Sequence, residues 1–298
     1  LLTGVQKFTL ENLLLGKETQ LLIISRIPRL VSILVTGASL GIAGIIVQTI
    51  SSNKFVSPST IGTMDWAKFG IMISLIFLGD KSTLLKMTVA FIFALFGTML
   101  FMKVLSKMKI KNVVMIPLIG IMLGNVVNSI TGFVAYKFDL IQNIGSWMQG
   151  NFALVVKGRY ELIYIGIPFL VLAYIYTDKF TIVGIGKDFS ANLGLNREKI
   201  TFIGLIIVSV ITASIVVTIG TIPYVGLIIP NIVSIYKGDN MKKSLPDTAI
   251  LGALFVLICD IAGRIVMYPY EVSISVIMSI VGSLIFLILV FRRYKYAN

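Results

Sequence analysis

The chain has 298 residues, of which 57% are hydrophobic and only 13% are charged, whereas a soluble domain of this length carries roughly 25% charged residues. Its net charge of +13 would suggest nucleic acid in a soluble protein, but basic residues also gather in loops that flank membrane spans, so we expect no nucleic-acid partner. Histidine is absent and Cys259 is the single cysteine; we therefore expect no disulfide framework, no metal site and no cofactor.

Long apolar runs predict an all-α, polytopic membrane protein with one transmembrane domain over residues 1–298. A helix needs about 20 mostly apolar residues to cross roughly 30 Å of hydrocarbon. The seventh candidate is short and holds Pro223 and Pro230, which membrane helices tolerate only where protein or a water-filled cavity satisfies the freed backbone. The nine candidate spans are 21–50, 60–79, 86–106, 113–136, 160–177, 200–219, 222–236, 246–267 and 271–291.

Two polar stretches interrupt this pattern. The opening, 1–18, is too polar to span and has no basic region ahead of its apolar residues, so we predict no signal peptide there. The stretch 138–158 is predicted to form a short helix on the surface. Glycines at helix-packing spacing, including Gly37, Gly41 and Gly44, predict a tightly packed bundle.

Lysine and arginine placement predicts the orientation. More of them follow alternate spans on the side of the C-terminal Arg292-Arg293 pair than lie opposite, and the positive-inside rule then puts the C-terminus in the cytoplasm. A chain that crosses the membrane nine times and ends in the cytoplasm must begin on the outer side. We therefore expect one further span upstream of Leu1.

Charged residues inside spans are costly, so each one suggests a function. Asp260 and Arg264 stand four residues apart on one helix face and are predicted to pair, and Glu271 opens the next span. No carboxylate relay crosses the middle of the membrane, as a proton-driven transporter often requires. The sequence also lacks a Gly-x-x-x-x-Gly-Lys-Ser/Thr phosphate loop and the common hydrolase motifs. We expect a transport subunit that is no enzyme and takes its energy from another chain.

Two segments outside the membrane are candidate contact surfaces. Arg26 and Arg29 flank Pro28 at the outer mouth of the first span; they either anchor that span in the headgroups or, with Arg264, receive carboxylates of an external partner. The inner segment 178–199 is amphipathic and longer than a connector needs to be. Its Ala191–Gly194 stretch is predicted to form a short helix ended by glycine that offers a surface to a cytoplasmic protein.

Six ordered motifs resemble the permeases that import ferric siderophores, haem and cobalamin. They cover nearly the whole chain, and the details of the second span are most similar to Gram-positive siderophore permeases, including petrobactin-type catecholate systems. The motifs are Arg26-Ile-Pro-Arg29 with Gly37–Gly44 and Gln48; Asn53–Pro58 with Ile61-Gly62; Trp147-Met-Gln-Gly150; Gly186–Gly194; Gly220–Asn231; and Leu245-Pro246 through Asp260, Arg264 and Glu271.

This resemblance implies a type II ABC importer permease with ten transmembrane helices per subunit. It implies a lipid-embedded dimer with an identical or related permease, two ATPase subunits below and an extracellular substrate-binding (lipo)protein above, with the fourth and last spans lining the path. The roles it implies are binding-protein docking by Arg26, Arg29 and Arg264, an inner gate at Asn53 and Phe55, and ATPase coupling through Gly186, Ala191, Leu193 and Gly194.

Departures from the family pattern bear on the cargo. Pro230-Asn231 and Ser234 stand where the family usually has Pro-His and an arginine, and Asp65-Trp66-Ala-Lys68 replaces small residues. These changes argue against cobalamin and favour an iron chelate; haem and cobalamin are the alternative cargoes within the family. A secondary transporter or channel that runs without ATP is the competing class. The sequence leaves open which chelate is carried and whether the two permeases are identical.

Overall fold

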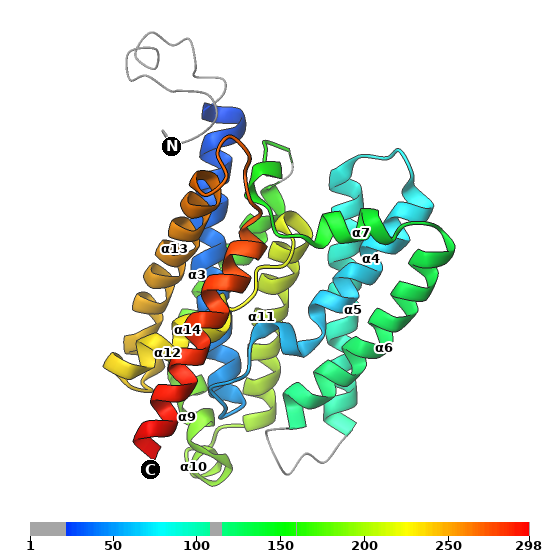
Figure 1. Ribbon diagram of the computed structural model, residues 1–298. Helices are drawn as coiled ribbons and strands as arrows, with labels where there is room; N and C mark the ends of the chain where they lie inside the picture. Colours follow the sequence, from blue (N-terminus) through cyan, green and yellow to red (C-terminus); the bar gives the residue numbers. More distant parts are fainter. Residues whose placement is uncertain (1–21, 108–114, 159, 298) are drawn as a thin grey trace.

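The computed structural model describes residues 22–107, 115–158 and 160–297 and shows a bundle of helices (Figure 1). The predicted polar opening 1–18 and the first two residues of the fourth predicted span, 113 and 114, lie outside the described residues. In chain order the elements are η1 (Leu22–Arg26), α3 (Ile27–Ile50), η2 (Pro58–Ile61), α4 (Thr63–Leu78), α5 (Thr83–Lys107), α6 (Met115–Lys137), α7 (Ile141–Met148), η3 (Phe152–Leu154), η4 (Glu161–Ile165), α8 (Gly166–Ile175), α9 (Thr177–Ile185), α10 (Lys187–Asn192), α11 (Arg197–Ile219), α12 (Val225–Lys237), α13 (Met241–Ile265) and α14 (Ile274–Ala297).

The all-α prediction is confirmed, and every predicted span contains helix. Six of the described helices are long and apolar enough to cross a membrane, and a seventh crossing is possible if the bent pair Glu161–Ile175 and Thr177–Ile185 counts as one span. The helices α4, with 16 residues, and α12, with 13, are shorter than a full crossing. Both follow irregular backbone, since Gly62 before α4 and Tyr224 before α12 have positive φ angles of 82° and 69°.

The long helix α3 is the centre of one half of the bundle. It packs against α13, α12 and α11, and residues around most of its circumference are buried. Glycines make these contacts possible: a Cβ on Gly37 would collide with the backbone of Gly252 in α13, and one on Gly44 with the backbone of Gly226 in α12. Since lipid tails provide no hydrophobic drive for helix association, such close backbone approach and its van der Waals contact hold the helices together.

The helices α4, α5 and α6 pack together as a second group at the side of the bundle (Figure 1). Gly97 of α5 receives the indole of Trp66, and Gly120 of α6 lies against the backbone of Thr60. Helix α11 joins the two groups, because Val216 and Val217 pack in the same apolar cluster as Ala67 of α4. The predicted surface helix in 138–158 is confirmed as α7, which is linked to α11 by a hydrogen bond from Trp147 Nε1 to the Val217 carbonyl (3.2 Å).

Glycine-mediated helix contact predicts the effect of adding one methyl group. Gly44→Ala should destabilise the fold by about 1–3 kcal/mol, because the new Cβ meets backbone of α12, which no side-chain rotation can relieve. The measurement is thermal unfolding in mild detergent, in which we expect a midpoint several degrees lower. Gly145→Ala in α7 is the matched control, since its Cβ would meet nothing within 4 Å; an equal loss in both variants would contradict the close-contact explanation.

Candidate functional site

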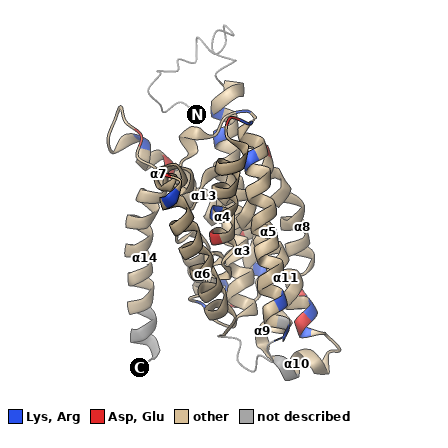
Figure 2. Ribbon diagram, turned by 90° about the vertical axis from the view of Figure 1, so that its right-hand side faces the viewer, with Lys and Arg blue, Asp and Glu red and all other residues tan. Residues whose placement is uncertain are grey.

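Charged residues in the described part of the chain concentrate toward the two ends of the bundle, and few lie between them (Figure 2). The start of α3 lies at one end, and α10 and the C-terminal end of α14 lie at the other (Figure 1). The predicted docking residues and the predicted coupling residues therefore belong to opposite ends of the bundle. This arrangement is what a protein with different partners on two membrane faces requires.

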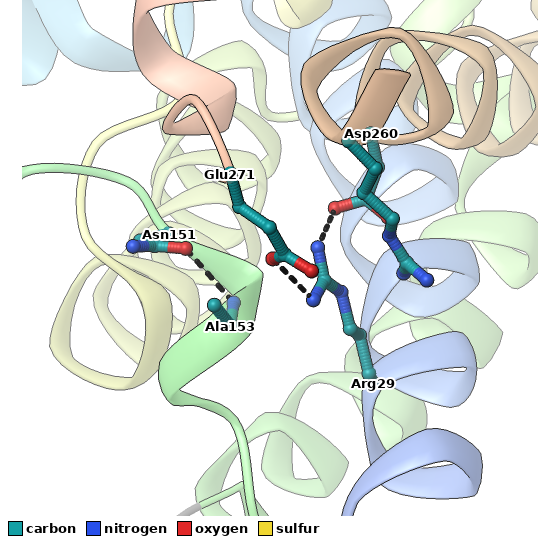
Figure 3. A network of polar contacts seen from close by, with 6 residues as sticks. Arg29, Asn151, Ala153, Asp260 and Glu271 are labelled. Carbon is teal, nitrogen blue, oxygen red and sulfur yellow. Dashed lines mark hydrogen bonds and ion pairs between the residues drawn. The ribbon is translucent and has the colours of Figure 1, made fainter. Parts of the chain in front are cut away.

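A cluster of two arginines and two carboxylates occupies the first of these ends (Figure 3). The Arg29 guanidinium donates to Glu271 Oε2 (2.7 Å) and to Asp260 Oδ1 (2.8 Å). Arg264 donates to the other Asp260 oxygen from Nη2 (2.6 Å) and Nε (3.0 Å). The Asp260 side chain is only 3% exposed, and those of Arg29 and Arg264 are 13% and 15% exposed.

This arginine–carboxylate cluster ties three separate parts of the chain together: α3, α13 and the segment that leads into α14. The predicted pair of Asp260 and Arg264 is confirmed. The contacts of Arg29 with Asp260 and Glu271 were not predicted, because they join residues more than 230 positions apart and local spacing carries no information about such contacts. Since two positive and two negative charges meet, the cluster is close to neutral, and its first role is to hold the helix ends.

Arg26 lies in η1, just before Arg29, and is partly buried. The structure thus brings Arg29 and Arg264 together around Asp260 and places Arg26 on the turn next to them. Docking by these arginines stays a prediction. The geometry adds one condition to this prediction: the carboxylates of a partner would have to share Arg29 and Arg264 with Asp260 and Glu271.

The predicted inner-gate residues lie in the loop between α3 and η2. Asn53 Oδ1 accepts a hydrogen bond from the Phe55 amide (2.9 Å), which fixes a local turn. The Phe55 ring is 51% exposed and packs edge-on against Phe286 of α14, with ring centroids 6.1 Å apart. The loop therefore reaches the last long helix.

A second amide anchors this loop to α12, and it was missed by sequence reasoning. Asn231 Nδ2 donates to the Lys54 carbonyl (2.7 Å) and to the Leu227 carbonyl (2.7 Å). Gln48, two residues before α3 ends, donates to the Leu227 carbonyl from the other side (3.2 Å). Asn231 stands where the family usually has histidine, and this difference could have drawn attention to the site. Its hydrogen-bond partner, the Lys54 carbonyl, could not be inferred from the sequence.

The predicted coupling residues form a short helical turn at the opposite end from the arginine–carboxylate cluster. Helix α9 bends by 60° from α8, Gly186 adopts a φ of 150°, and α10 follows. The short helix lies over Lys187–Asn192 rather than Ala191–Gly194, so Leu193 and Gly194 form the turn that ends it. The buried Ser190 hydroxyl donates to the Gly186 carbonyl (2.7 Å) and fixes this turn.

The outer surface of this turn is apolar and exposed. Ile185, Phe189 and Leu193 are 63%, 47% and 54% exposed, and Ala191 is also exposed. Exposed apolar side chains that gather on a polar rim mark protein contact sites more often than isolated ones do. We call residues 185–194 the elbow.

Comparisons with known proteins place the chain in a family. The FecCD transport family matches residues 2–292. The chain belongs to the FecCD transport family. No group of three or more His, Cys, Asp or Glu side chains able to hold a metal ion occurs among the described residues of this FecCD family member.

Relatives of this FecCD family member are permease proteins of import systems. The chain is 58% identical over 281 residues to the petrobactin import system permease protein YclN of Bacillus subtilis, covering 94% of this chain and 89% of that protein. It is 38% identical to the ferric-anguibactin transport system permease protein FatD of Vibrio anguillarum, covering 92% and 87%. A solved structure described as an inward-facing metal-chelate type ABC transporter has the same fold, with a TM-score of 0.84, 23% identity and coverage of 97% and 93%.

The arginine–carboxylate cluster predicts a strong effect of one neutral substitution. Asp260→Asn should destabilise the fold by about 3 kcal/mol, because it leaves two partly buried guanidinium groups without their shared carboxylate. Thermal unfolding in detergent measures the loss. Asp178→Asn is the matched control: it breaks the pair with Lys242, whose side chains are 64% and 56% exposed, and exposed pairs contribute about 1 kcal/mol or less. Equal stability of the two variants would refute the structural role of the cluster.

Proposed function

We propose that this FecCD family member is the transmembrane permease of an ATP-driven importer for an iron(III) siderophore of the petrobactin class. The observation that carries this proposal is the 58% identity with a petrobactin import permease over 94% of the chain. Two relatives, one from Bacillus and one from Vibrio, are named for petrobactin import and for ferric-anguibactin transport. Both names support a siderophore as the cargo. Haem and cobalamin are the alternative cargoes.

We propose that ATP hydrolysis by separate ATPase subunits drives the permease through the elbow. An elbow that inserts exposed apolar side chains such as Phe189 and Leu193 into a groove would transmit force through apolar contacts. The bend between α8 and α9 and the positive φ of Gly186 let the elbow project beyond the membrane spans. The elbow then faces the cytoplasm together with the C-terminus, in agreement with the placement of lysine and arginine.

At the opposite end, we propose that Arg26, Arg29 and Arg264 receive carboxylates of an extracellular binding protein. Incoming carboxylates would compete with Asp260 and Glu271 for the guanidinium groups. Docking would therefore loosen the links between α3, α13 and the start of α14. Exchange of ion-pair partners is thus a route by which binding outside could release the helix ends.

The path is proposed to run along α6 and α14, facing a second permease subunit. Both helices carry hydroxyl or amide groups at helical spacing on a partly or fully exposed side: Asn125 and Ser129 on α6, and Ser275, Ser279 and Ser283 on α14. Polar side chains in membrane helices face the bundle interior or a water-filled cavity rather than lipid. Phe55, in contact with Phe286 of α14, is positioned to narrow the inner end of such a path.

A reconstituted complex separates this function from a secondary transporter or channel. The chain is purified with its ATPase, incorporated into vesicles and supplied with the binding protein loaded with iron(III) petrobactin. Accumulation should require ATP and should stop when a non-hydrolysable analogue replaces it. Accumulation by vesicles that contain the permease without the ATPase would refute the proposal.

The elbow predicts a variant that separates ATP hydrolysis from uptake. Leu193→Glu should lower uptake roughly tenfold or more, because it puts a charge into an apolar contact, while ATP hydrolysis continues. Leu193→Met is the matched control that keeps an apolar side chain. Uptake per ATP hydrolysed is the measurement, and a normal ratio in Leu193→Glu would reject coupling through the elbow.

Docking predicts a salt-dependent loss of affinity. Charge reversal at Arg26 together with Arg264 should weaken binding-protein affinity about tenfold at low salt and less at high salt, since screening reduces the interaction between exposed charges. Lys157→Glu is the control, because it reverses an exposed charge beside η1 that lies outside the cluster. Unchanged affinity in the double variant, or an equal loss in the control, would contradict docking by these arginines.

A further inference from the structure

Lys68 is a cation within the predicted span 60–79, and among the described residues no carboxylate oxygen lies within ion-pair distance of it. It lies in the second turn of α4. Its ammonium donates to Asn128 Oδ1 in α6 (2.7 Å), and no salt bridge within 4.0 Å joins it to a described carboxylate. An ammonium has three N–H donors, so most of its binding capacity is unused. Charged groups within membrane spans are costly and mark functional sites.

Two structural explanations of Lys68 are weaker than a functional one. A lysine near a helix end extends its ammonium to the headgroups, but the bond to Asn128 holds this ammonium at the middle of α6, which runs from residue 115 to 137. Asp65 lies one turn earlier on α4, but its carboxylate packs against Gly124 and does not reach Lys68 within ion-pair distance. The positive charge is therefore held by a hydrogen bond to an amide, and Asp65 attracts it through space without forming an ion pair within 4.0 Å.

The surroundings of Lys68 on α6 are polar and open. Asn125 and Ser129, on the turn that carries Asn128, are exposed. No described residue hydrogen-bonds the Asn125 side-chain amide, and a Cβ on Gly132, one turn further, would meet nothing within 4 Å. This face of α6 thus offers a fixed cation, a free amide and space.

We propose that Lys68, positioned by Asn128 and flanked by Asn125, is a recognition element in the translocation path that favours negatively charged iron(III) chelates over neutral ones. This inference rests on the proposed function, because it requires the open face of α6 to line the path. Hydroxamate groups carry a single negative charge each, so an iron(III) complex of such groups is neutral, whereas doubly charged catecholates leave the complex anionic. A partly buried ammonium attracts the anionic complex and gives no advantage to the neutral one.

The first test measures uptake by the reconstituted complex with saturating binding protein that carries iron(III) petrobactin. Lys68→Gln keeps an N–H donor for Asn128 but removes the charge. We expect a maximal uptake rate about tenfold lower, with an unchanged half-saturating concentration of binding protein and an unchanged unfolding midpoint. Lys68→Arg should retain the rate, Lys68→Glu should lower it further, and Lys137→Gln at the exposed end of α6 should change nothing.

The second test measures the electrostatic potential beside Lys68 in the absence of the binding protein, from the reaction rates of charged thiol reagents. Because Cys259 is the single cysteine, Cys259→Ser with Asn125→Cys gives one labelling position beside Lys68. An anionic thiol reagent should react faster than a cationic one of the same size, and Lys68→Gln should abolish this preference. Equal preference with and without Lys68→Gln would overturn the proposal.

The two proposals fail in different ways. If the unaltered complex shows no ATP-dependent uptake, the proposed function is wrong. If the complex transports and Lys68→Gln transports at the same rate, or loses rate only in proportion to a fall in its unfolding midpoint, the recognition role of Lys68 is wrong and the proposed function stands.

Discussion

The close backbone contact of α3 with α12 and α13 is the interaction on which the rest of this structure depends. It uses glycine on both sides, Gly37 against Gly252 and Gly44 against Gly226. Side chains of any size would force the helices apart. In lipid, where apolar side chains gain nothing by leaving the solvent, this close approach gives the helices their van der Waals contact and fixes their positions.

Candidate functional residues lie at both ends of α3, the helix that contacts α12 and α13. At one end, Arg29 of α3 holds Asp260 of α13 and Glu271 before α14. At the other, Gln48 of α3 donates to the Leu227 carbonyl of α12, and Asn231 of α12 holds the loop that contains Asn53 and Phe55. Because α3 is one continuous helix between these sites, the proposed docking at Arg29 would be linked through it to the loop that contains Asn53 and Phe55.

Polar groups within this apolar bundle fall into two kinds. The arginine–carboxylate cluster is internally balanced, and its charges stabilise the positions of helix ends. Lys68 is hydrogen-bonded to an amide, and its nearest carboxylate, Asp65, attracts it through space without a direct ion pair, next to an open polar face of α6. This contrast separates a structural role from a recognition role, because only an incompletely balanced group has attraction left for a passing ligand.

The sequence by itself determined the membrane class, the presence of helix in each of the nine predicted spans, the surface helix at 138–158 and the pairing of Asp260 with Arg264. All of these depend on local apolar length or on residues less than two turns apart. The helix in the elbow was predicted over Ala191–Gly194 but lies over Lys187–Asn192. The sequence pattern marks the end of this helix, whereas its start depends on Gly186 and on the bend after α8. Only the tertiary structure decided which glycines face each other, that Arg29 shares Asp260 with Arg264, and that Lys68 meets Asn128. These contacts join segments from 60 to more than 230 residues apart, and their geometry is set by helix packing, which the local pattern of the chain does not specify.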